Sequence, residues 1–79
     1  MITMTLYGRP ECHLCEAMAA ELAPLLEGRA NLQVVDISDD DDLEVRYGLR
    51  IPVLVAGESE LSVYRLDKQR VEHYLARGD

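Results

Sequence analysis

The sequence predicts an α/β fold in which a mixed four-stranded sheet packs against helices, in the element order β-α-β-α-β-β-α. Short runs rich in β-branched residues alternate with segments whose apolar residues recur at helical spacing, and glycines or prolines separate them. The opening strand–helix–strand unit should be parallel with a right-handed crossover, and the last two strands should form an antiparallel hairpin. This arrangement uses every apolar face of the chain.

The first half of the chain should contain two strands and two helices. Residues 2–7 are predicted to form a strand that ends at Gly8. A helix is predicted over about residues 13–27, because apolar residues recur there at helical spacing. These residues are Leu14, Met18, Leu22 and Leu25. Pro24 removes a backbone donor inside this helix, so we expect a kink or early fraying of the last turn before Gly28 ends it.

The middle of the chain combines an apolar strand with an acidic run. Residues 32–37 are apolar on both alternating sets, which predicts a strand covered on two faces. The acidic run 38–42 precedes a short helix that ends at Gly48, and its carboxylates should cap the free N–H groups of that helix. A calcium or magnesium site is the alternative, although the run lacks the spaced ligands and turn glycine of a calcium loop.

The last part of the chain should be a hairpin followed by a helix. Residues 51–55 are predicted to form a strand that opens with a proline, and residues 61–64 an edge strand paired with it. Asp67 is the expected N-cap of the last helix, with Leu66 and Val71 forming a hydrophobic staple across it. The inward stripe of this helix should consist of Val71, Tyr74 and Leu75.

Composition bounds the class of protein. The 79 residues (1–79) should form a single domain, expected to be a monomer, and 15 acidic against 8 basic residues give a net charge of −7. This balance argues against a nucleic-acid partner, which needs clustered Lys and Arg, and against adsorption to anionic lipid. No signal segment is visible, and no apolar run reaches the ~18–20 residues that span a membrane. We therefore expect a cytoplasmic protein.

Cys12 and Cys15 form a C-x-x-C motif where the first strand turns into the first helix. Two cysteines are too few for the disulfide framework of a small secreted protein. Residues three apart share one face of a helix, and their Cα separation of about 5–5.5 Å suits a disulfide that opens and closes without large backbone movement. The position of the pair therefore predicts redox chemistry.

The two cysteines should have different roles. Cys12 is the predicted nucleophile, because free N–H groups at a helix start stabilise a thiolate and lower thiol pKa values from ~8.5 to between ~3.5 and ~7.5. Arg9 can add a positive charge. Cys15 is the predicted resolving thiol, which attacks a mixed disulfide on Cys12. His13 either helps to stabilise the thiolate or faces solvent, and both alternatives stay open.

Three alternatives to a redox pair remain. Buried cysteines can be plain small apolar residues. A structural zinc site needs four ligands, and only His13 and His73 remain as nitrogen donors, so no metal site is predicted within one chain. An iron–sulfur cluster shared between two chains is the third alternative.

Two runs of the sequence resemble glutaredoxin-like proteins. Residues 6–15, Leu-Tyr-Gly-Arg-Pro-Glu-Cys-His-Leu-Cys, resemble the opening of that family, and residues 47–54, Tyr-Gly-Leu-Arg-Ile-Pro-Val-Leu, resemble its second signature. The resemblance extends from Thr5 to about Leu75 and is to the short glutaredoxin-like proteins. It implies a thioredoxin-like, glutaredoxin-type fold.

The resemblance also implies roles for single residues. Arg9 falls where a glutaredoxin has the Lys that meets the glutathione carboxylate, and Pro52 falls on the family's cis-proline. The backbone of Ile51 would then pair with a bound peptide or glutathione as a short added strand. Asp67 falls on the Asp that holds the γ-glutamyl end of glutathione. The candidate substrate-binding residues are therefore Arg9, His13, Ile51, Pro52 and Asp67.

The chain departs from glutaredoxins at two places. It has Cys-His-Leu-Cys where they carry Cys-Pro-Tyr-Cys, and Tyr64-Arg65-Leu66 where they carry two glycines and a polar residue. These departures put glutathione in question as the working partner.

The sequence thus predicts a thiol–disulfide oxidoreductase in which Cys12 and Cys15 reduce protein or glutathione mixed disulfides, with a reductase as electron donor. No tightly bound cofactor is expected, and glutathione is a candidate co-substrate. The alternative is a non-enzymatic thioredoxin-like binding module, which shares an iron–sulfur cluster in a dimer or docks a partner. A purely structural domain is a third class.

Overall fold

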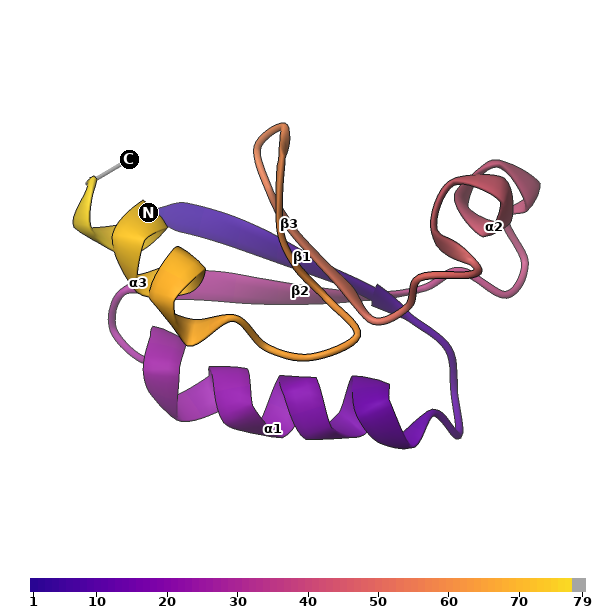
Figure 1. The fold of residues 1–79 in the computed structure, drawn as a ribbon, viewed down its shortest axis with the longest axis horizontal. Helices are drawn as coiled ribbons and strands as arrows, with labels where there is room; N and C mark the ends of the chain where they lie inside the picture. The colour runs from indigo at the N-terminus through magenta and orange to yellow at the C-terminus, as the bar shows by residue number, and fades with distance from the viewer. Residues whose placement is uncertain (78–79) are drawn as a thin grey trace.

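The computed structural model describes residues 1–77, and the last two residues of the predicted domain 1–79 lie outside this range. It confirms the predicted α/β class and element order (Figure 1). The elements are β1 (Ile2–Gly8), α1 (His13–Leu26), β2 (Ala30–Asp36), α2 (Asp41–Tyr47), β3 (Val53–Ala56), β4 (Ser59–Val63) and α3 (Lys68–Ala76). The sheet has the order β2-β1-β3-β4, with β1 and β2 parallel and the other neighbours antiparallel.

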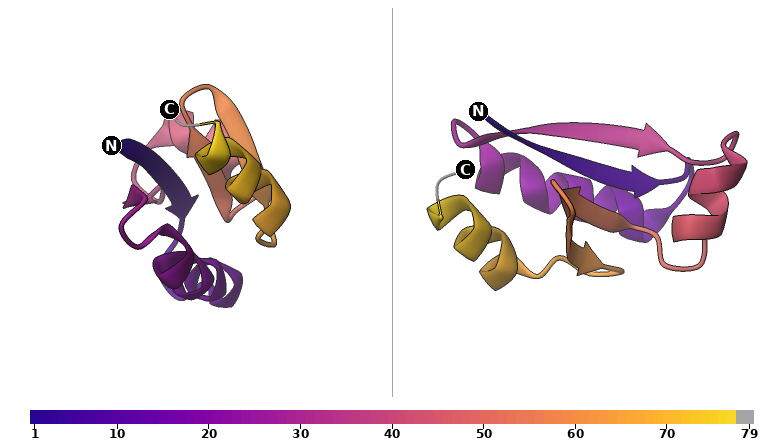
Figure 2. Two further views of the ribbon diagram at one scale, coloured as in Figure 1. Left: turned by 90° about the vertical axis from the view of Figure 1, so that its left-hand side faces the viewer. Right: turned by 90° about the horizontal axis from the view of Figure 1, so that it is seen from above.

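Helices α1 and α3 lie on one face of the sheet, and α2 lies beyond the carboxyl ends of β1 and β2 (Figures 1 and 2). The larger core cluster fills the space between the sheet and these two helices. Its buried members are Met4, Leu6, Met18, Leu22, Leu26, Leu54, Ala56, Leu61 and Val71. Each large side chain buried there contributes about 1.5–3 kcal/mol relative to an exposed position. This cluster holds α1 against the middle of the sheet.

A second, smaller core cluster lies on the opposite face of the sheet and fixes α2. Ile37, Tyr47 and Val53 are its buried members. The ring of Tyr7 from β1 stacks on the ring of Tyr47 from α2, with centroids 4.3 Å apart and planes 15° from parallel. This contact joins α2 to the carboxyl end of β1, and the two cysteines come shortly after this end of the strand.

The prediction that residues 32–37 are covered on two faces is wrong for the strand itself. β2 is an edge strand in which no residue is fully buried, and the Val34 side chain is 64% exposed. α2 lies beyond the carboxyl ends of β1 and β2 rather than over this edge of the sheet (Figure 1). Only Ile37, directly after the strand, is buried.

The helix boundaries follow the predicted signals closely. Helix α1 runs through Pro24 to Leu26, so the expected fraying of its last turn does not occur, because Leu22 and Leu26 are buried against the sheet on either side of the proline. Asp40 Oδ1 accepts a hydrogen bond from the Leu43 N–H at 3.1 Å, which confirms capping by the acidic run. Across residues 1–77, no three His, Cys, Asp or Glu side chains gather as a metal site.

The hairpin differs from its predicted limits. β3 begins at Val53 rather than at residue 51, and β4 ends at Val63 rather than at residue 64. A register shift lies between Leu54 and Val55. Tyr64 lies past the strand with φ of 70°, a backbone conformation that few residues other than glycine adopt.

Within residues 1–77, no helix combines the length and the hydropathy that crossing a membrane would need.

The core packing predicts the stability of two leucine variants. Leu22→Ala should lower the free energy of unfolding by about 2–5 kcal/mol, because Leu22 is fully buried between α1 and the sheet and its loss leaves a cavity. Leu49→Ala, at an exposed position, should change it by less than about 0.5 kcal/mol. Urea denaturation of the oxidised protein measures both values. Equal effects of the two changes would contradict this account of the core.

Candidate redox site

Cys12 and Cys15 lie where the carboxyl end of β1 leads into α1. Cys12 is the N-cap of α1, and Cys15 lies one turn into the helix. Their sulfur atoms are joined in a disulfide with a Cα–Cα separation of 5.2 Å. This value agrees with the separation expected from the three-residue spacing.

The sulfur of Cys12 caps the helix. The backbone N–H of Cys15 donates a hydrogen bond to Cys12 Sγ at 3.2 Å, and the N–H of Glu16 donates to the Cys12 carbonyl at 3.0 Å. An oxygen of Ser, Thr, Asp or Asn usually takes this position and satisfies a free amide of the first turn. Here the acceptor is a sulfur, so a negative charge on Cys12 would lie against N–H groups at the positive end of the helix.

The two cysteines differ in their exposure to solvent. Cys12 is half-buried, whereas Cys15 is 8% exposed. Cys15 packs directly on Gly8: a Cβ at that glycine would lie 2.7 Å from Cys15 Sγ. The absence of a side chain at Gly8 therefore allows α1 to approach β1 closely enough to enclose the second sulfur. Cys12 is thus the more accessible of the two cysteines.

Pro52, the proline predicted to be cis, lies next to the contact between Gly8 and Cys15. The Ile51–Pro52 peptide bond is cis, as the family resemblance implied, and Pro52 is buried. Tyr7 pairs with Val53 in the antiparallel ladder, so Pro52 comes beside Gly8, on which Cys15 packs. Among the hydrogen bonds of residues 1–77, none involves the backbone N–H or C=O of Ile51.

Arg9 is engaged with an acidic partner. Its guanidinium forms an ion pair with Glu44 of α2, and a Cβ at Gly48 would lie 3.2 Å from Arg9 Nη2. Hydrogen bonds from Ser38, with a smaller contribution from the charge of Arg9, lower the pKa of Asp36. The guanidinium of Arg9, which was predicted to add a positive charge near Cys12, thus interacts with Glu44 of α2 and with Asp36 at the end of β2.

The remaining predicted site residues lie in different places. His13 is exposed at the first position of α1. Asp67 caps α3: its Oδ1 accepts a hydrogen bond from the Arg70 N–H at 3.1 Å, and its own N–H donates to Ser62 Oγ at 2.9 Å. Figure 1 shows α3 beside the C-terminal part of α1.

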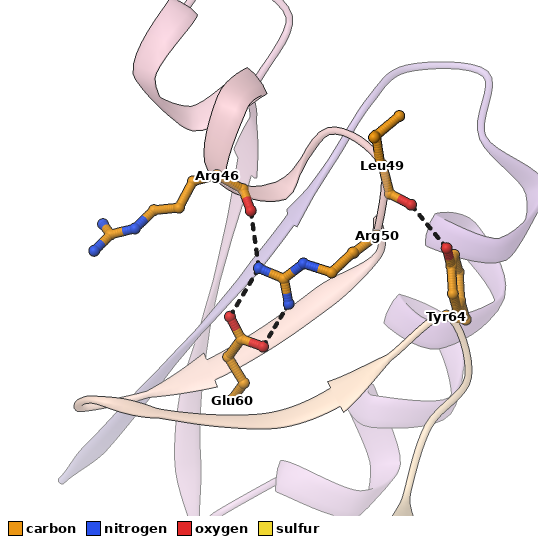
Figure 3. Close-up of polar contacts among 5 residues, drawn as sticks. All are labelled: Arg46, Leu49, Arg50, Glu60 and Tyr64. Carbon is orange, nitrogen blue, oxygen red and sulfur yellow. Dashed lines mark hydrogen bonds and ion pairs between the residues drawn. The ribbon is translucent and has the colours of Figure 1, made fainter.

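Hydrogen bonds from other elements hold the segment before Pro52 in place (Figure 3). The Arg50 guanidinium donates to both carboxylate oxygens of Glu60, at 2.6 and 3.1 Å, and to the Arg46 carbonyl at 2.8 Å. The Tyr64 hydroxyl donates to the Leu49 carbonyl at 2.7 Å. The hydrogen bond from Arg50 lowers the pKa of Glu60, and in return the pKa of Arg50 is raised.

These supporting residues have no local sequence signal that connects them with the cysteines. Glu44 and Glu60 are two of 15 acidic residues, and their Arg partners are 35 and 10 positions away. The glycine at position 8 is visible in the sequence as the end of a strand, but its contact with Cys15 depends on how the helix packs.

The comparisons with known proteins agree with this geometry. The sequence matches the model of the glutaredoxin-like domain (DUF836) over residues 3–76. The solution structure of protein Ne2328 from Nitrosomonas europaea is 37% identical, with a TM-score of 0.83 over 92% of this chain and 89% of that chain. The X-ray structure of protein XcR50 from X. campestris is 35% identical, with a TM-score of 0.74 over 96% of this chain and 99% of that chain.

More distant matches bear on the fold alone. Mitochondrial thioredoxin 3 from Saccharomyces cerevisiae, in its oxidized form, is 13% identical, with a TM-score of 0.70 over 96% of this chain and 77% of that chain. The predicted thioredoxin-like fold is thereby confirmed. No curated protein matches the sequence.

The contact between Gly8 and Cys15 predicts the effect of adding a methyl group. Gly8→Ala should lower the free energy of unfolding by about 1–3 kcal/mol and shift the dithiol–disulfide equilibrium, because the new Cβ overlaps Cys15 Sγ. Gly28→Ala is the matched control: it meets no atom within 4 Å but has φ of +74°, so it should cost stability without moving the redox equilibrium. Titration against glutathione redox buffers measures the dithiol–disulfide equilibrium of each variant. Equal equilibria in the two variants would contradict the role of the contact between Gly8 and Cys15.

The lowered pKa of Glu60 predicts a pH-dependent contribution to stability. A carboxyl whose pKa is lower in the folded chain stabilises the fold above its unfolded pKa of ~4.3, and this contribution is lost as the pH falls through the folded value. Glu60→Gln should therefore be less stable than the natural protein at neutral pH, and the difference should shrink below about pH 4. Urea denaturation at both pH values measures this, with Glu58→Gln in the same hairpin controlling for net charge. A difference that stays constant with pH would contradict the prediction.

Proposed function

This chain belongs to the glutaredoxin-like domain family, and on that basis we propose that it is a thiol–disulfide oxidoreductase that reduces protein or glutathione mixed disulfides. One observation carries the proposal. A disulfide joins a half-buried Cys12, which caps a helix through its sulfur, to a Cys15 that is almost fully buried one turn later. A plain structural disulfide would not need this difference between its two sulfurs.

The first step is attack by the reduced Cys12 thiolate on one sulfur of a substrate disulfide. A bond forms between Cys12 Sγ and that sulfur, the substrate S–S bond breaks, and the leaving thiolate takes up a proton. The Cys15 N–H that donates to Cys12 Sγ, together with the helix start, would stabilise the attacking charge. The product is a mixed disulfide on Cys12.

The second step is intramolecular. Cys15, already within disulfide distance of Cys12, loses its proton and attacks Cys12 Sγ, which restores the Cys12–Cys15 bond and releases the substrate as a second thiol. Two electrons have then passed from the dithiol to the substrate. A thiol reductant or a reductase returns them in the next cycle. Both steps are displacements at sulfur, so the scheme involves no bound metal or flavin.

The substrate would be held by groups that flank the cysteines. The unpaired backbone of Ile51, beside Pro52, supports pairing with an extended substrate segment. Arg9 can attract a carboxylate only in competition with Glu44, and His13 is free to contact a bound substrate because it is exposed. We place this monomer in the cytoplasm, where reducing conditions favour dithiol chemistry over permanent disulfides.

Single-cysteine variants test the two roles. Cys15→Ser should trap a mixed disulfide with a disulfide-containing peptide, because no second thiol resolves it, whereas Cys12→Ser should trap far less. Each of these variants retains one of the two thiols. Cys12 should be alkylated faster than Cys15 at about pH 6.5, because the free N–H groups at the helix start stabilise its thiolate, whereas Cys15 is buried. Mass spectrometry measures adducts and alkylation rates. No trapping by Cys15→Ser, together with no disulfide reduction by the natural protein, would exclude the enzyme function.

A further inference from the structure

We infer that the outer strand β2 pairs edge to edge with β2 of a second copy of this chain, in an antiparallel arrangement about a two-fold axis. This pairing joins the four-stranded sheets of the two copies into one continuous sheet. It goes beyond the proposed function, because it assigns a partner to the edge of the sheet and involves none of the reacting sulfur atoms.

Strand β2 lacks the features by which proteins protect an outer strand. The unpaired N–H and C=O groups of such a strand can bind any strand that comes alongside, so outer strands are usually short or carry a charge, a proline or a bulge. β2 has seven residues in regular register with β1 and forms the outer side of the sheet (Figure 2). Residues 30–35 include neither a charged residue nor a proline. β2 is therefore open to pairing along its length.

The other outer strand, β4, is protected in the usual ways. It has five residues, it carries Glu60, and its pairing with β3 contains a register shift. After β4 the chain turns back on the strand, where the Arg65 N–H donates to the Val63 carbonyl at 2.8 Å. This contrast within one sheet indicates that β2 is left open for a partner.

An apolar surface accompanies the open edge. Val34 is 64% exposed, and it lies on the same face as Ala30 and Leu32, which pack against the larger core cluster, because side chains alternate along a strand. Beside Val34, a hollow of about 300 Å³ lies between α1 and β2, with Leu6 and Ala19 among its apolar lining. A partner that covers this side chain and the hollow removes apolar surface from water, which favours association.

The sequence of β2 suits pairing with itself. In an antiparallel pair, residues directly opposite each other lie on the same face of the sheet. With Gln33 on the two-fold axis, Leu32 lies opposite the partner's Val34, and Val34 lies opposite the partner's Leu32. The exposed valine of each copy is thereby covered by an apolar side chain of the other, on the face that α1 occupies.

The charges at the two ends of β2 are opposite in sign. Arg29 directly precedes the strand, and Asp36 is its last residue. Antiparallel pairing brings Arg29 of each copy beside the partner's Asp36, near the exposed carboxylate of Glu16 at the rim of the hollow. Parallel pairing would instead place like charges together at both ends. Charge complementarity therefore favours the antiparallel dimer.

The dimer is expected to be weak and reversible. One pair of strands makes a small interface, and interfaces below about 1,200 Å² are typical of weak complexes. The net charge of −7 on each copy opposes association, but at about 0.15 M salt charges more than about 8 Å apart are largely screened. The monomer of the proposed function therefore predominates when dilute, in equilibrium with the dimer at high concentration.

Sedimentation equilibrium of the oxidised protein in about 0.15 M salt tests the inference. The average mass should rise from that of one chain at about 10 μM toward that of two chains at about 1 mM, which corresponds to a dissociation constant on the order of 100 μM. Both cysteines are joined within one chain, so no disulfide between chains contributes to this mass. The mass of a single chain over the whole range would overturn the inference.

A lysine on the edge strand tests which surface pairs. Val34→Lys places a charge on the apolar face of the edge and should raise the dissociation constant at least about tenfold. Val45→Lys is the matched control, because it makes the same substitution and the same change of net charge at an 89% exposed position of α2. It should change the dissociation constant by less than about twofold. Equal effects of the two variants, or no effect of Val34→Lys, would show that β2 is not the interface.

A second set of variants tests the direction of pairing. Arg29→Gln removes the cation at the strand end and should raise the dissociation constant about three- to tenfold. Arg29 also binds Glu72 within its own chain, at 2.8 and 3.3 Å, so Glu72→Gln breaks that pair and keeps the cation. Glu72→Gln should not raise the dissociation constant, and neither should Arg46→Gln, which changes the net charge equally on α2. An equal rise in Arg29→Gln and either control would overturn the antiparallel pairing.

These measurements are independent of the disulfide chemistry. None of them uses a disulfide substrate, and all are made on the oxidised protein. A protein that dimerises through β2 but reduces no disulfide would overturn the proposed function alone, whereas an active protein that stays monomeric would overturn the inference alone.

Discussion

The close approach of α1 to the end of β1 is the contact on which the rest of the site depends. Gly8 leaves room for the Cys15 sulfur, so the first turn of the helix lies directly on the strand. This packing buries one sulfur and leaves the other at the helix start, where it accepts the Cys15 N–H. The difference in exposure between Cys12 and Cys15 is therefore a result of backbone packing rather than of the cysteine spacing alone.

The two faces of the sheet serve different purposes. The face under α1 and α3 holds the larger apolar cluster, which keeps the start of α1 in position relative to the sheet. The opposite face holds the smaller cluster around Tyr47, and this cluster anchors α2 next to the segment that precedes Pro52. The ion pair from Arg9 to Glu44 joins α2 to the segment after β1, and the ion pair from Arg50 to Glu60 joins the segment before Pro52 to β4. Each ion pair is partly exposed and contributes modestly to stability. Their larger effect is on the position of the backbone beside the disulfide.

The features that were predicted correctly depend on neighbours along the chain. Capping of α2 by the acidic run, the N-cap Asp67 and the end of the first helix near Gly28 each follow from a few adjacent residues. The cis Ile51–Pro52 bond was implied by the family resemblance rather than by any local rule. The features that were missed or wrong depend on distant residues. Exposure of β2 follows from its place at the sheet edge, and the role of Tyr64 follows from a hydrogen bond to a residue 15 positions earlier.

The sequence by itself determined the element order, the helix caps and the placement of Cys12 and Cys15 at the junction of a strand and a helix, because these follow from local periodicity and from the three-residue spacing. Only the tertiary structure decided which acids pair with Arg9 and Arg50, and that Cys15 packs directly on Gly8. Fifteen carboxylates and eight cations allow many pairings of similar energy. Strand order and helix packing select among them, and those arise from the burial of the whole apolar core.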